Sequence, residues 1–255
     1  MTLFTQNLKV VLFCVLSITL IFQNEAVIAQ SSEQVWLEYM LNIPIKTKYN
    51  IEFASTYATE IETPKWHSLD FQITPEVALN KHVDFMAAIL GSHTYQAKSV
   101  TTKEIREMIG VRLHIAPDKR VKTRLLTRLE HRNLYSDESE IWETNMRLRI
   151  RAETITPLVL DKVYTSNNQC YMIADLEQFI SLNHEVHERF ANRLRARLGI
   201  GYLIHYGLRL ELVYTLQLSK NNFEDGYNST ENIFRFRLKQ YLNKNKPSKA
   251  QGTGN

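Results

Sequence analysis

Apolar and polar side chains alternate along much of the chain after residue 30, with a period of two residues. This period is typical of β-strands, in which successive side chains point to opposite faces. It is clearest between residues 121 and 132, where one face carries Val121, Thr123, Leu125, Thr127 and Leu129, and the other carries Lys122, Arg124, Leu126, Arg128, Glu130 and Arg132. A helix would scatter the charged positions around its axis and break any apolar stripe. The pattern therefore predicts long strands, each with one apolar and one charged face.

Eleven segments follow this pattern, and most are longer than the five or six residues usual in soluble sheets. They span residues 33–43, 48–58, 66–78, 82–95, 103–116, 120–133, 141–155, 170–179, 188–202, 205–218 and 231–242. Short turns are expected at 44–47, 80–81, 117–118 and 203–204, and longer loops at 59–65, 96–102, 134–140 and 219–230. Bacterial single-chain outer-membrane barrels have an even number of strands, with short turns on one rim and long loops on the other. Because residues 156–169 could hide another strand, we expect an all-β fold, a single antiparallel up-and-down barrel of ten to twelve strands.

The two ends of the chain differ from this pattern. An apolar run over residues 10–22 follows Lys9, and small residues lead up to Ala29, as in a secretory signal peptide. A membrane anchor is the alternative, although the run is short for a membrane span. We expect a signal peptide over residues 1–29, a barrel domain over 30–242 and a disordered polar tail over 243–255.

Alternation alone leaves two places for the charged face. In a soluble sandwich the apolar face forms the core and the charged face meets water. In an outer-membrane barrel the apolar face meets lipid and the charged face lines the lumen. Export from the cytoplasm and the length of the strands favour the barrel. Aromatic residues near the strand ends favour it too, because Tyr and Trp suit the level of the lipid headgroups. These aromatic residues are Trp36, Trp66, Tyr95, Trp142, Tyr202, Tyr206 and Tyr241.

Four segments resemble domain-of-unknown-function family 2490, an uncharacterised family of secreted proteins. They are QVWLEY at 34–39, RLEHR at 128–132, RLRIR at 147–151 and NRLRARLGIGY at 192–202, and the resemblance covers roughly residues 33–240. The resemblance implies an outer-membrane β-barrel. It implies no catalytic residues, because the family has no established activity.

The charged faces hold more cations than anions. The charged residues expected to line the lumen are Arg124, Arg128, Glu130, Arg132, Glu143, Arg147, Arg149, Arg151, Glu153, Arg193, Arg195, Arg197, Arg209, Glu211, Arg235 and Arg237. One interpretation is a network of Arg and Glu that fills a narrow barrel and makes it rigid. The other is an anion-preferring pore, or a cavity for a phosphate or carboxylate group, because the planar guanidinium suits such groups. The expected partners are outer-membrane lipid and small anionic solutes.

No motif in the sequence indicates an enzyme, a cofactor or a metal site. His184 and His187 lie in an expected loop, where their spacing does not place them on one face as metal ligands. Cys14 falls in the apolar run, so Cys170 has no disulfide partner in the mature chain. The net charge of +4 is modest, and the basic rows lie beside glutamates, so we expect no nucleic-acid partner. A His–Ser pair on neighbouring strands, as in a lipid hydrolase, is the enzymatic alternative.

The sequence therefore predicts an outer-membrane barrel that serves as a narrow anion-preferring pore or as a structural component of the envelope. The main alternative is a soluble periplasmic sandwich that binds a ligand. The sequence does not indicate a particular solute or an oligomeric state.

Overall fold

The computed structural model describes residues 31–61, 65–96, 101–158, 167–182, 192–220 and 229–242. No helix among these residues is long and apolar enough to cross a membrane. The described residues form the strands β1 (Ser31–Lys46), β2 (Tyr49–Glu60), β3 (Trp66–Ala78), β4 (Val83–Gln96), β5 (Thr101–His114), β6 (Lys122–Ser136), β7 (Ile141–Pro157), β8 (Gln169–Ser181), β9 (Asn192–His205), β10 (Leu208–Lys220) and β11 (Ser229–Tyr241). The expected signal peptide and the expected polar tail lie outside the described residues.

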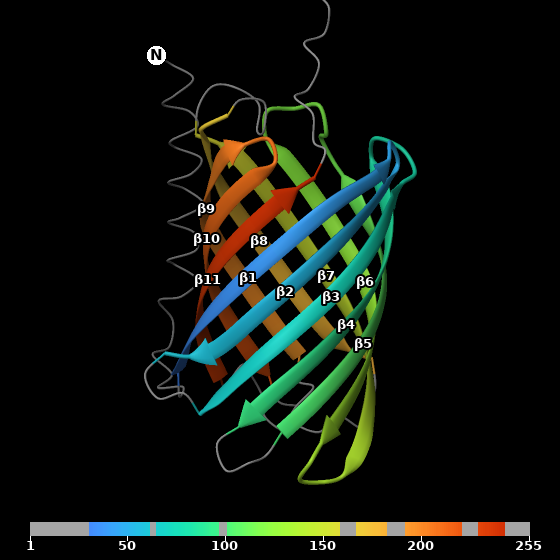
Figure 1. Cartoon of the computed structure of the whole chain (residues 1–255), viewed down its shortest axis with the longest axis vertical. Helices are drawn as coiled ribbons and strands as arrows, with labels where there is room; N and C mark the ends of the chain where they lie inside the picture. The colour runs from blue at the N-terminus through green and yellow to red at the C-terminus, as the bar shows by residue number, and fades with distance from the viewer. Residues whose placement is uncertain are drawn as a thin grey trace, which may run out of the picture. The chain divides into compact units, whose positions relative to one another are not determined.

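These strands form one closed barrel in which each strand pairs with its neighbours in the sequence (Figure 1). All of those pairs are antiparallel, and the barrel closes through a parallel pair between β1 and β11. Eleven is an odd number, so the first and the last strand run in the same direction and can only meet in parallel. The expected all-β barrel of ten to twelve strands is therefore confirmed, and only its closure differs, because the first and the last strand pair in parallel. The sandwich alternative is also excluded, because the described strands form a single closed sheet.

Each of the eleven expected segments overlaps one observed strand, with shifts of a few residues at the ends. The stretch 156–169 contains no additional strand among its described residues, since β7 ends at Pro157 and β8 begins at Gln169. Residues 159–166 of that stretch lie outside the described residues.

Two predictions about the connections are corrected by the structure. The turn expected at 203–204 lies inside β9, and the chain reverses at Tyr206 and Gly207 instead, where the Gly207 amide donates to His205 Nδ1 at 3.1 Å. The connection 158–168 is longer than the turns 47–48 and 206–207, yet it lies on the same rim. Short turns and long loops are thus not separated cleanly between the two rims.

The outside of the barrel is apolar. Large apolar side chains at alternate positions are about half exposed or more, among them Phe71, Ile89, Ile109, Leu176 and Phe236. They come from strands all around the barrel, and their neighbours in each strand point inward. Glu107 and His131 interrupt this surface on β5 and β6, but a soluble protein rarely exposes so extensive an apolar surface.

Aromatic side chains divide between the two faces. Tyr95, Trp142 and Tyr202 are exposed on the outside. Trp36, Trp66 and Tyr241 instead line the lumen, because they share their alternate positions with inward charged residues such as Glu38 and Lys239. The expectation that these three lie at a lipid headgroup level is therefore wrong.

Apolar side chains also fill part of the interior. Ile155, Tyr171, Ile173, Leu203 and Val213, from β7 to β10, form a buried cluster. None of these five side chains lines the cavity described below. The cluster therefore fills the space between the strands and that cavity, near the rim at which β7 ends.

Candidate functional site

A single cavity of about 1140 Å³ occupies the lumen. Its lining includes Lys46 and Tyr49 beside the first turn on one rim, and Ser32, Trp66 and Gln96 on the other. Among the described residues, eighteen Lys or Arg side chains and nine Asp or Glu side chains line it. The cavity therefore extends from rim to rim, and the charges on its wall are mainly positive.

The sixteen charged residues expected in the lumen lie as follows. The cavity is lined by Arg124, Arg128, Arg132, Arg147, Arg149, Arg151, Glu153, Arg193, Arg195, Arg197, Arg209, Arg235 and Arg237. Glu130 and Glu211 lie behind that lining, buried against its cations. Glu143 shares the inward positions of β7 but does not line the cavity, and one of its carboxylate oxygens is buried without a hydrogen-bond partner in the described part of the chain.

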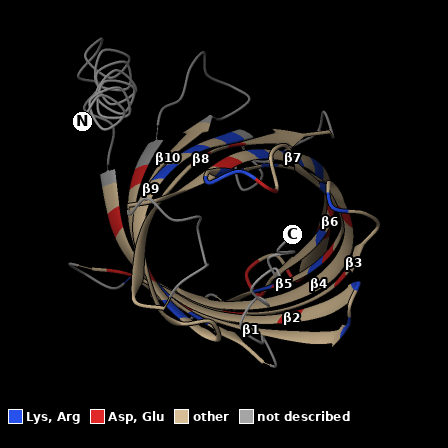
Figure 2. Cartoon of the chain, turned by 90° about the horizontal axis from the view of Figure 1, so that it is seen from above, with Lys and Arg blue, Asp and Glu red and all other residues tan. Residues whose placement is uncertain are grey.

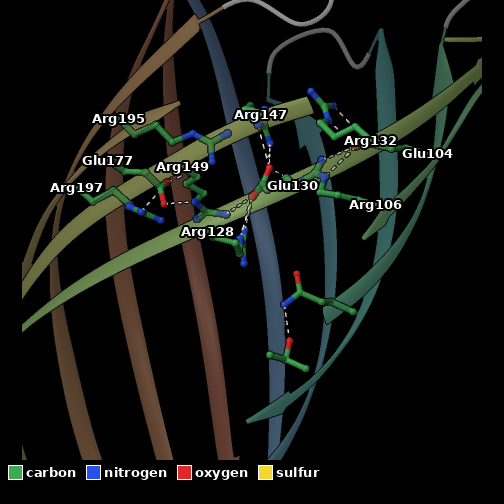
Figure 3. A network of polar contacts seen from close by, with 12 residues as sticks. Glu104, Arg106, Arg128, Glu130, Arg132, Arg147, Arg149, Glu177, Arg195 and Arg197 are labelled. Atoms are coloured by element: carbon green, nitrogen blue, oxygen red, sulfur yellow. Dashed lines mark hydrogen bonds and ion pairs between the residues drawn. The ribbon is translucent and has the colours of Figure 1, made fainter. Parts of the chain in front are cut away.

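Glu130 is the centre of the first ion-pair network (Figure 3). The register of β6 and β7 places it opposite Arg147 and places Arg128 opposite Arg149. Its fully buried carboxylate accepts hydrogen bonds from Arg128 Nη2 at 2.7 Å and Arg147 Nε at 2.9 Å. Arg149 and Arg106 also form ion pairs with this carboxylate, at 3.5 and 3.9 Å. One carboxylate thus holds four guanidinium groups at the middle of the wall.

Glu177 on β8 is the centre of a second network. It pairs with Arg149, with Arg197 at 2.8 Å and with Arg195 at 3.8 Å, and it is fully buried. Asp175, two residues earlier, accepts from Arg197 at 2.6 Å. The sequence reasoning missed both acids, although they share alternate positions with inward Phe179 and could have been found from that period.

Two smaller groups of ion pairs, around Glu104 and Glu211, lie on either side of these two networks. Glu104 accepts hydrogen bonds from Arg132 at 2.7 and 2.9 Å and from Arg106 at 2.9 Å. On the far side of the arginines, Glu211 accepts from Tyr171 at 2.8 Å and pairs with Arg237 and Lys239.

Glu38 on β1 is the acid of the seam between the first and the last strand. It pairs with Arg237 and, at 3.8 Å, with Arg235. Ion pairs therefore link the strands from β5 to β9, and a second set links β10, β11 and β1 across the closure.

Two aromatic rings also position guanidinium groups. Arg147, Arg149 and Arg195 have their Cζ atoms 4.5, 5.0 and 4.9 Å from the centre of the Phe179 ring. Arg235 lies 4.5 Å from the Trp36 ring, and Arg195 lies 5.6 Å from it. Cations within about 6 Å of an aromatic face are attracted to it, so these rings hold like charges close together.

Arg151 and Arg193 differ from their neighbours. Both line the cavity, yet within the described residues neither side chain makes a hydrogen bond or an ion pair, and the Nε atom of each is buried. A guanidinium out of bulk water is costly unless its charge is matched. Glu153 and Glu177 act electrostatically on Arg151, and Glu231 acts on Arg193, but none of these acids forms a contact ion pair with either guanidinium.

Two opposite sides of the lumen carry side chains of different chemistry. We call the lumenal face of β6, β7 and β9 the arginine wall, formed by Arg128, Arg132, Arg147, Arg149, Arg151, Arg193, Arg195 and Arg197. In a ring of eleven strands, β3 lies across the lumen from β8 and β9. The lumenal face of β2 to β4, the polar wall, contributes hydroxyl, amide and acidic side chains to the cavity but no Lys or Arg among the described residues. Seen along the barrel, the ribbons of β2 to β4 are mostly tan, whereas basic segments gather near β6 and β7 (Figure 2).

The described histidines do not form a hydrolase-like pair with serine. His114 contacts Asp84 at 2.7 Å, and His131 contacts Glu107 at 3.0 Å on the outer face. No described His ring is hydrogen-bonded to a Ser hydroxyl. His184 and His187 lie outside the described residues.

Comparison with known proteins adds the family. A model of a family described as a protein of unknown function (DUF2490) matches residues 33–228, which include the arginine wall and the polar wall. No curated protein matches the chain significantly.

Proposed function

We propose that this chain, which belongs to the DUF2490 family of proteins of unknown function, is an outer-membrane barrel whose lumen is a narrow, anion-preferring pore. The mainly apolar outer face supports the membrane location, because such a surface is stable against lipid and unfavourable in water. The signal-peptide pattern of residues 1–29 supports export from the cytoplasm.

The pore part of the proposal is carried by one observation, a rim-to-rim cavity whose lining cations outnumber the acids even when the buried Glu130, Asp175, Glu177 and Glu211 are counted with them. In a narrow lumen with low-dielectric walls, an excess of one sign of charge concentrates counterions of the other sign. Rings of Arg or Lys give selectivity for anions in this way. Chloride and small organic anions would therefore enter more readily than potassium.

A second candidate function has support from the same wall. Glu130 and Glu177 are fully buried, and each binds three or four arginines, so that part of the lumen is a fixed network rather than open space. Such a network suits a rigid structural component of the envelope. The two candidates differ in whether the remaining cavity conducts ions.

The test is to insert the purified, folded barrel into a planar lipid bilayer and to record current at constant voltage. The pore proposal predicts discrete current steps. A folded and inserted barrel that gives no steps would support the structural role instead.

Membrane location is tested separately, by fractionation of cell envelopes and by gel migration. The barrel should be recovered with outer membranes and should migrate faster unheated than boiled, because a closed barrel stays compact in detergent. Recovery as a soluble protein in detergent-free buffer would contradict the membrane part of the proposal.

A further inference from the structure

We propose that the lumen binds hydroxylated organic anions, with the phosphate or carboxylate group on the arginine wall and the hydroxyl groups on the polar wall. This inference rests on the proposed function of the lumen and specifies the class of solute that it takes.

The arginine wall supplies the anion subsite. Arg151 and Arg193 face the cavity without a hydrogen bond or contact ion pair among the described residues, while Phe179 and the buried acids fix the neighbouring guanidiniums in place. A guanidinium presents a planar fork of N–H donors that matches the oxygens of phosphate and carboxylate. A multivalent oxyanion would interact with several of these groups at once, so it should bind more strongly than chloride.

The polar wall supplies the second subsite. Thr56, Ser68 and Thr94 line the cavity, and their hydroxyls make no hydrogen bond within the described residues. Asp70 also lines the cavity and accepts from Ser92 at 2.6 Å, which leaves it further acceptor capacity. Hydroxyl and carboxylate groups of this kind bind polyols through hydrogen bonds, and they neither attract nor neutralise the anionic group.

The two walls face each other across one cavity, and this arrangement selects for a ligand with two different ends. A simple anion would use only the arginine wall, and a neutral sugar only the polar wall. A sugar phosphate or a sugar acid would use both, and would lie across the lumen in one orientation.

The experiment is a fluorescence titration of the full chain, folded in lipid-free detergent. Trp36 and Trp66 line the cavity and report on binding there, and a Trp142→Phe background removes the exposed outer tryptophan. The probes are glucose 6-phosphate, inorganic phosphate and glucose. We expect glucose 6-phosphate to bind roughly tenfold more tightly than inorganic phosphate, because several hydrogen bonds are added, and glucose to bind more weakly than either.

Variants assign the two subsites. Arg151→Gln should weaken both phosphate probes by roughly tenfold or more, whereas Lys81→Gln, the same charge change on an exposed turn outside the lumen, should leave them unchanged. Thr56→Val combined with Ser68→Ala should weaken glucose 6-phosphate and leave inorganic phosphate unchanged. The inorganic phosphate arm of this variant also shows that its arginine wall is intact.

The outcomes separate this inference from the pore proposal. Equal binding of glucose 6-phosphate and inorganic phosphate, or the absence of saturable binding by either, would overturn the two-wall inference even if the barrel conducts anions. Saturable binding in lipid-free detergent also assigns a free solute rather than a lipid headgroup. Because the titration needs no ion flow, it can succeed in a barrel that gives no current.

Discussion

The ring of Tyr171 lies so close to Gly201 that no side chain fits between them. A Cβ atom at Gly201 would lie 2.2 Å from Cζ of Tyr171. The two residues face each other on the neighbouring strands β8 and β9. The hydroxyl of the same tyrosine donates to Glu211 at 2.8 Å, so the close approach also sets the position of a lumenal acid.

We predict that Gly201→Ala destabilises the barrel by about 1–3 kcal/mol, because the added methyl must displace a fully buried ring. The measurement is the urea midpoint of unfolding, followed by the loss of the fast-migrating form on a gel. Gly91→Ala is the matched control, since a Cβ there meets nothing within 4 Å. Equal midpoints for the two variants would show that the ring has room to move.

The Glu130 network gives a second prediction. Glu130→Gln removes the only negative charge that Arg128, Arg147 and Arg149 share within the β6–β7 pair, and like charges would then face each other in a buried site. Breaking a buried ion pair by removing one partner costs about 3–5 kcal/mol. Asp118→Asn, which removes an exposed acid paired with Lys81 between two turns outside the strands, should cost less than about 1 kcal/mol.

Comparable losses of stability for Glu130→Gln and Asp118→Asn would contradict the network. Both variants are measured by the same urea titration. Their difference matters more than either value alone, because the reference state is shared.

The outer face gives a prediction that distinguishes lipid from water. Ile109 is 54% exposed on the outside of β5. In a bilayer, Ile109→Arg should destabilise the barrel by about 2–4 kcal/mol if the residue lies near the midplane. On a water-exposed surface the same change should stay within about 0.5 kcal/mol. Unfolding of the variant and of the parent protein in liposomes measures the difference, and a value near zero would argue against a lipid environment.

Arg151 and Arg193, which line the cavity, give a prediction about ion selectivity. Arg151→Glu combined with Arg193→Glu replaces two cationic charges of the cavity wall with anionic ones, so the preference for chloride over potassium should fall or reverse. Lys65→Glu combined with Lys81→Glu makes the same charge change outside the cavity lining, and it should leave the preference nearly as it was. A similar change in both double variants would place the selectivity at the rims instead.

Much of the fold could be predicted from the sequence because one face of each strand is apolar and the other charged. A slip of one residue would exchange the two faces, so the period fixes which residues point inward, as it does for Arg147, Arg149 and Arg151. The parallel pairing of β1 with β11 could not be predicted in this way. Alternation delimits the eleven strands, but it carries no information about which strands meet to close the ring or in which direction.

The missed parts of the site have a related cause. Glu177 and Asp175 lie on a strand whose other inward positions are Tyr171, Ile173 and Phe179, so their segment does not show a charged row. The place of Trp36 near a strand end predicts an outward side chain at the lipid headgroups, although its position in the alternation with Glu38 puts it in the lumen. In both cases the period was more informative than residue type.

The most direct test of the account is the reversal potential of the open barrel in a planar bilayer with a tenfold gradient of potassium chloride. The account predicts a reversal potential of the sign set by chloride, moving further in that direction at lower salt, where the fixed cations of the lumen are screened less. A reversal potential of the sign set by potassium, or one at zero, would contradict the claim that a cationic lumen selects the ions that pass.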